Sequence, residues 1–268
     1  MTVAPKFIAT SRVMRDLAEQ ILRFAATDAN VLIAGETGSG TNAIAQEIHA
    51  RGPRARLPFV TVDCAALTGS LIDSELFGHE RGAYTDAITA RPGRFELAGG
   101  GTVYLDAVTE LALEAQGKLL RIVEEKKVER LGSHTAVAMG ARIVSSVDAQ
   151  IEDAVRAGRF RHDLYHRLRV LPLVVPPLRD RRDDILPLAR HFLKQAASAA
   201  RRTPPAIARD AASALADYRW PGNVRELRHA VARAFAAAEG HALTLDHLPP
   251  EILEPPEVRA SVQPSRRP

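Results

Sequence analysis

The apolar residues of this chain follow two different patterns, and the change lies near residue 176. Before that point, five short apolar runs alternate with helical patterns; they lie at Val31–Ile33, Phe59–Val62, Thr102–Leu105, Ile143–Val144 and Val170–Val175. Such runs are typical of buried strands, and parallel strands need long crossover connections. The pattern therefore predicts an α/β domain whose parallel sheet is covered by helices.

Beyond Val175 only helical patterns follow. The stretch Pro176–Asp184, PPLRDRRDD, is rich in proline and charge and is interpreted as a linker. Three alanine-rich segments come next and predict a small helical bundle; they span Ile185–Ala200, Ala206–Tyr218 and Val224–Ala238. We expect an α/β domain over residues 1–178, an all-α domain over 179–253, and a tail over 254–268 without fixed structure.

A further helix is predicted ahead of the first strand. Val13, Leu17 and Ile21 recur at helical spacing, and Ser11 is of a residue type that caps helix N-termini. The helix is expected to end near Ala25 and to lead directly into the first strand.

The stretch VLIAGETGSGTN, Val31–Asn42, has the layout of a phosphate-binding P-loop, which is a strand, a glycine-rich loop and a helix. Glycine lets successive backbone N–H groups converge on phosphate oxygens, and the helix N-terminus adds partial positive charge. The candidate nucleotide-binding residues are Gly35, Glu36, Thr37, Gly38, Ser39, Gly40, Thr41 and Asn42.

One part of this motif is missing. After Gly40 the motif requires a lysine and then a hydroxyl residue for Mg²⁺, whereas this chain has Thr41 and Asn42. Asp106, at the end of the run TVYLD, is the candidate Mg²⁺ ligand, because magnesium prefers oxygen ligands. An isolated aspartate here is more commonly a cap or turn residue, but the P-loop upstream favours the metal role.

Composition excludes several other classes. The 268 residues have a net charge of +4 and are 46% hydrophobic, which is ordinary for a globular protein and does not by itself indicate nucleic-acid binding. The single cysteine, Cys64, excludes an intramolecular disulfide and predicts a reducing, cytoplasmic setting. No apolar run approaches the roughly 20 residues of a membrane span, and no signal-peptide pattern is present.

The histidines show no metal-ligand spacing together with cysteine or carboxylate residues, so we expect surface or packing roles for them. They are His49, His79, His134, His162, His166, His191, His229, His241 and His247. No serine or cysteine lies in a nucleophile-elbow motif.

Four longer stretches, in consistent order and spacing, resemble the central AAA+ domain of bacterial sigma-54-dependent transcriptional activators. They are SELFGHERGAYTDA (Ser74–Ala87), GRFELAGGGTVYLD (Gly93–Asp106), FRHDLYHRL (Phe160–Leu168) and WPGNVREL (Trp220–Leu227). The resemblance runs from about Phe7 to Leu253. It implies a three-layer α/β/α P-loop domain and a helical lid, with ATP or ADP and Mg²⁺ bound between adjacent subunits of a ring.

The resemblance also implies roles for three arginines. Arg161 and Arg167 would be arginine fingers that reach a neighbouring subunit's nucleotide, since a planar, permanently charged fork suits phosphate oxygens. Arg225 would be the sensor arginine of the lid. Without the motif, Arg161 and Arg167 would be read as solvated side chains. Trp220 and Pro221 are expected to be packing and helix-start residues.

The loop that contacts sigma-54 in this family corresponds to Gly82, Ala83, Tyr84, Thr85, Asp86 and Ala87. Tyr84 replaces the family's phenylalanine, a mild change, and Thr85 is retained. Asp86 replaces a glycine, which adds charge at an apolar contact and restricts the backbone. We therefore expect impaired engagement of sigma-54 RNA polymerase.

Several departures from the family meet at the catalytic centre. Thr41 replaces the P-loop lysine, and Ala107 replaces the glutamate that activates water in ATP-hydrolysing members; Asp63 and Asp148 also depart from the family pattern. A lost charge-assisted phosphate contact costs about 1.5–3 kcal/mol, tenfold to a hundredfold in affinity. A lost general base costs about 10²–10⁴ in rate. We expect weakened nucleotide binding and little hydrolysis.

The leading hypothesis is a degenerate module of this family, a pseudoenzyme that joins or blocks rings of an intact relative. Two alternatives stay open, namely an active ATPase that remodels sigma-54 RNA polymerase, and a nucleotide-free scaffold or relic. We expect no sensory domain before Phe7, and no helix-turn-helix or sequence-specific DNA binding after Leu253.

Overall fold

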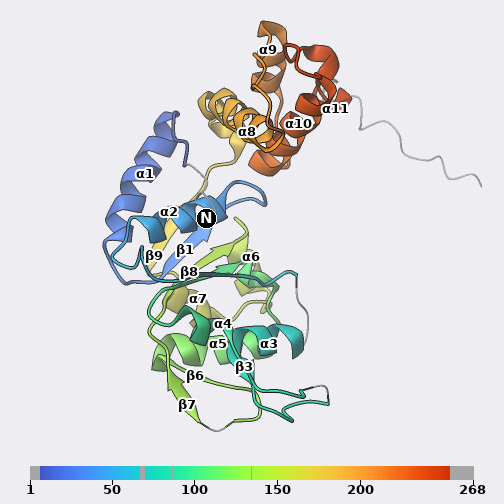
Figure 1. Ribbon diagram of the computed structural model, residues 1–268. Coiled ribbons are helices and arrows are strands. Elements are labelled where there is room, and N and C mark those ends of the chain that lie inside the picture. Colours follow the sequence, from blue (N-terminus) through green and yellow to red (C-terminus); the bar gives the residue numbers. More distant parts are fainter. Residues whose placement is uncertain (1–6, 67–69, 86, 134, 254–268) are drawn as a thin grey trace, which may run out of the picture. The chain divides into compact units, whose positions relative to one another are not determined.

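The chain folds into two compact units in the computed structural model, which describes residues 7–66, 70–85, 87–133 and 135–253 (Figure 1). Unit 1 contains Val13–Pro176. Unit 2 contains Ile8–Arg12 and the chain from Pro177 onward. The tail predicted over residues 254–268 lies outside the described residues.

Unit 1 is built on a five-stranded sheet in which all neighbouring strands are parallel, as the apolar runs predict. Its strands, in spatial order, are β2 (Phe59–Asp63), β5 (Thr102–Asp106), β8 (Arg142–Val147), β1 (Val31–Ala34) and β9 (Leu171–Val174). Because the strands are parallel, their carboxyl ends meet at one edge. In this register Asp63 lies opposite Asp106.

Helices cover both faces of this sheet. Successive side chains of a strand point to opposite faces, and the apolar runs therefore have buried side chains on both. Leu32, Leu105 and Ile143 belong to a buried cluster shared with one set of helices. Those helices are α3 (Ser70–Phe77), α4 (Arg94–Ala98), α5 (Leu113–Glu125) and α7 (His162–Leu168). Helix α2 (Thr41–Ala50) packs against β1, β5 and β8, which gives the expected three-layer α/β/α arrangement (Figure 1).

The other elements attached to this layered core are short, apart from the N-terminal helix. Helix α1 (Arg12–Ala25) ends where the sequence predicts. The short elements are α6 (Ile151–Arg156), a 3₁₀ turn at Val108–Glu110, and two antiparallel pairs, β3 (Gly78–His79) with β4 (Arg91–Pro92) and β6 (Lys127–Glu129) with β7 (Ala136–Ala138).

Unit 2 is helical, as predicted. It contains α8 (Ile185–Ala199), α9 (Arg209–Asp217), α10 (Asn223–Ala237), a 3₁₀ turn at Leu245–His247 and α11 (Pro250–Leu253). Trp220 is fully buried in the core of this unit, and its indole N–H donates to the carbonyl of Leu215 at 2.9 Å. The packing role expected for Trp220 is therefore confirmed.

The stretch Pro176–Asp184, which its composition predicts to be a linker, is structured, and from Pro177 onward it belongs to unit 2. It forms two 3₁₀ turns, and Leu178 and Asp184 are fully buried. The carboxylate of Asp184 accepts hydrogen bonds from the backbone N–H groups of Thr10 (2.6 Å) and Ser11 (2.8 Å), and from the Ser11 hydroxyl (2.6 Å). Composition alone cannot reveal such burial, because the partners lie more than 170 residues away in sequence.

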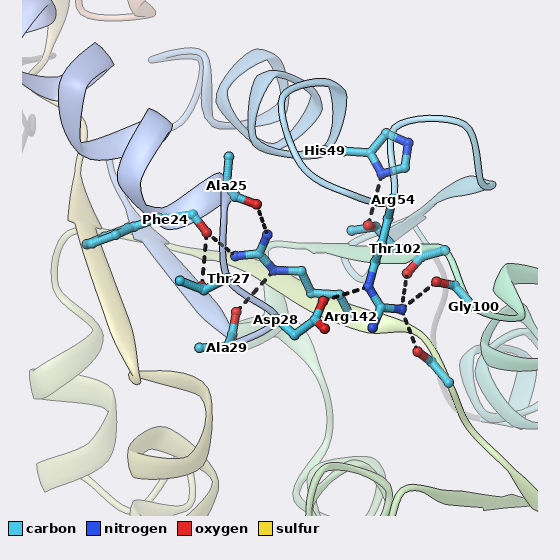
Figure 2. A network of polar contacts seen from close by, with 12 residues as sticks. Phe24, Ala25, Thr27, Asp28, Ala29, His49, Arg54, Gly100, Thr102 and Arg142 are labelled. Carbon is cyan, nitrogen blue, oxygen red and sulfur yellow. Dashed lines mark hydrogen bonds and ion pairs between the residues drawn. The ribbon is translucent and has the colours of Figure 1, made fainter.

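An arginine network lies at the amino-terminal edge of the sheet (Figure 2). Arg142, the first residue of β8, is only 4% exposed. Its guanidinium donates to the carbonyl oxygens of Phe24 (2.8 Å), Ala25 (3.4 Å) and Ala29 (3.1 Å). It therefore satisfies carbonyl groups at the end of α1, where a positive charge also complements the helix dipole.

A second arginine extends this network to the loops before β5 and β8. Arg54 donates to the carboxylate of Asp28 at 2.8 Å, and also to the carbonyls of Gly100 and Gly140 (Figure 2). Beside it, His49 Nδ1 lies 2.9 Å from Thr102 Oγ1. The amino-terminal edge of the sheet, or scaffold edge, is therefore held by charge-assisted hydrogen bonds, which are stronger than neutral ones.

Candidate nucleotide site

The P-loop connects β1 to α2 at the carboxyl-terminal edge of the sheet. Gly38 and Gly40 have φ angles of 79° and 108°, a region that favours glycine, and a Cβ built on Gly40 would meet nothing within 4 Å. At Gly35, a Cβ would lie 2.8 Å from Ser39 Oγ. Gly40 caps α2 without a side-chain hydrogen bond, which suits the helix N-terminus to phosphate binding.

Thr41, at the lysine position, belongs to a network of hydroxyl groups. The phenol oxygen of Tyr104 lies 3.2 Å from Thr41 Oγ1 and donates to Asp106 Oδ1 at 2.9 Å. Since an ionised carboxylate only accepts, the single phenol proton serves Asp106, which leaves the Thr41 hydroxyl to donate to the phenol oxygen. Burial raises the pKa of Tyr104, and the charge of Asp106 raises it further, so the phenol keeps its proton.

Ser146, on the adjacent strand β8, completes this network. Its hydroxyl donates to Asp106 Oδ1 at 2.6 Å and accepts from the backbone N–H of Ala107 at 2.9 Å. In the part of the chain that the structure describes, no lysine, arginine or histidine forms an ion pair with Asp106. The carboxylate is therefore held by neutral donors, where a P-loop lysine would supply a cation.

Three other positions near this edge differ from a standard P-loop site. Asn42, where a hydroxyl ligand of Mg²⁺ is usual, accepts a hydrogen bond from Gln46 at 2.8 Å within α2. Ala107 has a φ of 54°, in the left-handed region, and its methyl group cannot accept a proton. Asp63 Oδ1 accepts from the N–H groups of Ala65 and Ala66 in a local turn. Asp63 and Asp106 supply two carboxylates at this edge.

The two proposed finger arginines lie at the start of α7 and within it, and both are exposed. Arg161 precedes the first residue of the helix, and its guanidinium pairs with Asp163 at 2.8 Å, which lowers the pKa of Asp163. Arg167 pairs with Glu124 of α5 at 2.9 Å. Both pairs are solvent-accessible and therefore weak, so the arginines can exchange partners at low cost.

A buried glutamine that the sequence analysis did not identify holds the start of α7. Gln116 is fully buried, and its side-chain oxygen accepts from the backbone N–H of Arg161 at 2.8 Å. Its amide nitrogen donates to the carbonyls of Leu111 and Arg159. No local pattern marks this glutamine, because its partner lies 45 residues away.

The contact of Tyr104 with Asp106, by contrast, could have been predicted from the sequence. Tyr104 stands two residues before Asp106, so both side chains lie on the same face of the strand.

The remaining predicted site residues lie elsewhere. Arg225 is exposed on α10, in unit 2. In the predicted sigma-54 contact loop, the N–H of Gly82 donates to the carbonyl of Ala87 at 2.8 Å. Tyr84 is 37% exposed, and its ring makes an edge-to-face contact with the ring of His79. Asp86, the departure expected to matter most, lies outside the described residues. Among the described residues no helix is long and apolar enough to cross a membrane.

Comparison with known proteins decides the family. The family model described as "Sigma-54 interaction domain" matches residues 7–174, and that described as "AAA+ ATPase lid domain" matches residues 179–264. The chain belongs to the sigma-54-dependent activator family. It represents the AAA+ module of that family, with the α/β core and helical lid that the resemblance implies.

Relatives of this sigma-54-type module are bacterial regulators. The chain is 44% identical over 248 residues to the regulatory protein AtoC of Escherichia coli, covering 92% of this chain and 54% of AtoC. It is 44% identical over 235 residues to the sigma54-dependent transcriptional activator SfnR of Pseudomonas putida, covering 86% of this chain and 64% of SfnR. The module thus spans about half to two thirds of the length of these two relatives.

Solved structures agree with this assignment. NtrX from Brucella abortus in complex with ATP aligns with a TM-score of 0.86 at 38% identity, covering 96% of this chain and 58% of NtrX. The same protein in complex with ADP gives a TM-score of 0.85 at 38% identity, covering 95% of this chain and 58% of NtrX.

Proposed function

We propose that this AAA+ module binds ATP or ADP weakly, hydrolyses ATP poorly, and regulates rings formed by itself or by related sigma-54 activators. One observation carries the proposal. The positions that supply a cation and a general base hold Thr41 and Ala107, and Asp106 is contacted by hydroxyl groups instead of a lysine.

The phosphate-binding part of the site fits a nucleotide. Open space at Gly40 and the uncapped start of α2 leave room for phosphate oxygens, which the residues from Gly35 to Asn42 would surround. Asp106 has an oxygen, Oδ2, with no donor among the described residues, and it would hold Mg²⁺ directly or through water. The ATP and ADP complexes of NtrX support nucleotide binding by this module.

The catalytic part fits less well. Mg²⁺ would neutralise charge on the phosphates, but no lysine is present to share that task, and Ala107 cannot activate water. Loss of the lysine contact predicts a tenfold to hundredfold weaker affinity. Loss of the base predicts a rate lower by about 10²–10⁴. Binding at millimolar nucleotide can survive the first loss, whereas turnover is reduced by both.

The partners proposed for the module follow from α7 and the contact loop. Arg161 and Arg167 are exposed and only weakly paired, which supports a role at a neighbouring subunit's nucleotide. The family model supports sigma-54 RNA polymerase as the further target. Asp86 would weaken that contact, so the module would act mainly by supplying arginines to rings, or by blocking them.

Mixing with an intact activator tests this proposal. Adding the purified chain at increasing ratios should change the activator's ATP turnover in proportion to ring incorporation. The Arg161→Ala and Arg167→Ala variants should incorporate equally but lower turnover further, while Arg91→Ala, an exposed arginine away from α7, should match the unmodified chain. No change at any ratio would overturn the mixed-ring role.

A second candidate, an active ATPase, is favoured by one observation. Asp63 lies opposite Asp106 in the β2–β5 register, so a second carboxylate stands at the catalytic edge. If Asp63 replaces the missing base, the chain alone should turn over ATP, and both Asp63→Asn and Asp106→Asn should abolish that turnover. Failure to bind labelled ATP with Mg²⁺ would instead favour a nucleotide-free scaffold.

A further inference from the structure

Two histidines for which the sequence predicted surface or packing roles meet on α7. His162 and His166 are one helical turn apart, both are exposed, and their Nε2 atoms lie 3.0 Å from each other. Their ring centroids are 4.3 Å apart. Residues at i and i+4 share one face of a helix, so the pairing follows directly from helical geometry.

The separation of these nitrogen atoms matches a particular metal geometry. With metal–nitrogen bonds of about 2.0–2.1 Å, a separation of 3.0 Å gives an angle at the metal of about 91–97°. A tetrahedral angle would need a separation of about 3.3 Å. The pair therefore fits adjacent positions of a square-planar or octahedral ion, the geometry that Cu²⁺ and Ni²⁺ adopt with nitrogen and oxygen ligands.

The surrounding structure holds the helix backbone that carries both histidines. Leu164 and Leu168 are fully buried, and Tyr165 is 8% exposed, so the backbone of α7 is held against the core of unit 1. The ring of His166 lies edge-on to the ring of Tyr165, at 5.4 Å between centroids. Only rotations of two exposed imidazole rings are needed to turn both nitrogen lone pairs toward one ion, which limits the cost of ordering.

We propose that His162 and His166 form a bidentate site for Cu²⁺ or Ni²⁺. The ion would replace the proton shared between the two Nε2 atoms, with water completing its coordination. In the described residues no group of three or more His, Cys, Asp and Glu side chains could hold a metal ion, so the remaining positions stay open to exchange. Such positions can accept a ligand from a second chain.

The site would change the behaviour of the segment that carries Arg161 and Arg167. A metal bridge across one helical turn favours the helical conformation of α7, because the ion binds the folded form and not the unfolded one. The ion also adds positive charge at His162 and His166, which lie between Arg161 and Arg167 in the sequence. The inference does not depend on the proposed function, since metal binding can be measured without nucleotide or ring partner.

Copper titration of the untagged chain tests the proposal. Isothermal titration with Cu²⁺ should show one site, and His162→Gln and His166→Gln should each weaken it about 10²-fold, because each removes one arm of a chelate. Electron paramagnetic resonance should report two equivalent nitrogen ligands in the unmodified chain and one in either variant. Thermal unfolding in EDTA should be the same for all three, since both side chains are exposed.

His191→Gln is the matched control. His191 is a half-buried helical histidine with Gln195, not a second histidine, one turn later, so this variant should bind Cu²⁺ as the unmodified chain does. Equal affinity in the single variants and the unmodified chain would overturn the proposal. A loss in His191→Gln as large as in His166→Gln would also overturn it.

Discussion

The two edges of the central sheet hold their polar groups in opposite ways. At the amino-terminal edge, Arg142 and Arg54 each donate to several carbonyl groups, so a cation stands at the centre of each local network. At the carboxyl-terminal edge, Asp106 is held by the hydroxyls of Tyr104 and Ser146. At the scaffold edge both guanidinium groups are satisfied by hydrogen bonds. At the carboxyl-terminal edge, no cation among the described residues forms an ion pair with Asp106.

This difference fits the proposal that the module keeps its fold with Thr41 and Ala107 at the carboxyl-terminal edge of the sheet. A polar group shielded from water is costly when it lacks a partner, and the hydroxyl network gives partners to Thr41 and Asp106, both of which are half-buried. At the other edge, three carbonyls near the end of α1 share one guanidinium, which joins that helix to the sheet. Substitutions at the two edges should therefore have separable effects on activity and on stability.

The largest expected effect is a gain of ATP hydrolysis at the carboxyl-terminal edge of the sheet, where the P-loop lies (the nucleotide edge). Thr41→Lys with Ala107→Glu restores a cation and a base, so ATP turnover should rise by about 10²–10⁴. Steady-state phosphate release measures it. Adding Asp106→Asn to this double variant should remove the gain. A double variant that binds ATP tightly without faster turnover would contradict the assignment of Ala107.

At the scaffold edge, Arg142→Met should destabilise the protein without altering nucleotide binding. Methionine keeps much of the volume but donates to none of the three carbonyls. Each lost charged hydrogen bond is worth about 1.5–3 kcal/mol, but burial of the charge, which lowers the pKa of Arg142, offsets part of this, so we expect a net loss of about 2–3 kcal/mol.

Urea unfolding measures this loss, and Arg91→Met is the control. Arg91 is exposed and has one ion pair with Glu75 at 3.4 Å, so its replacement should cost under about 0.5 kcal/mol. Similar losses in both variants would show that the carbonyl contacts of Arg142 do not stabilise α1.

A smaller effect is expected from removing the phenol hydroxyl at the nucleotide edge. Tyr104→Phe takes one neutral donor from Asp106, which frees carboxylate charge for Mg²⁺, so the affinity for ATP with Mg²⁺ should rise about fivefold, or about 1 kcal/mol. Fluorescence titration with labelled ATP measures it. Ser146→Ala removes the other donor and should act in the same direction. An equal gain in EDTA would contradict a role through the metal.

The smallest effect concerns pH at the scaffold edge. Burial lowers the pKa of His49 below its usual value of 6.5, so the unfolded chain binds this proton more readily than the folded chain. The free energy of unfolding should therefore fall as pH drops below about 6.5, with a slope no steeper than the binding of one proton gives. His49→Gln should reduce that slope in urea unfolding between pH 7 and pH 5. An unchanged slope would show that other groups cause it.

Sequence reasoning recovered the framework because local patterns encode it. The apolar runs predicted all five strands of the parallel sheet, and the glycine pattern located the turn between β1 and α2. The three long helices of unit 2 were predicted within a few residues of their ends, whereas the short helix α11 was not predicted. The interpretation of Pro176–Asp184 as a linker was wrong, because Leu178 and Asp184 are buried by distant parts of unit 2.

The sequence by itself determined the fold class, the family resemblance and that Thr41 and Ala107 stand where the resemblance implies a lysine and a glutamate, because these depend on residue identity and local spacing. Only the tertiary structure decided what surrounds those positions. It brought the hydroxyl groups of Tyr104 and Ser146 into hydrogen bonds with Asp106. It also joined Gln116 to the backbone of Arg161, and the guanidinium of Arg142 to a carbonyl of α1. Most of these contacts join residues that are 40 or more positions apart in sequence, so they form only when the strands and helices are packed together.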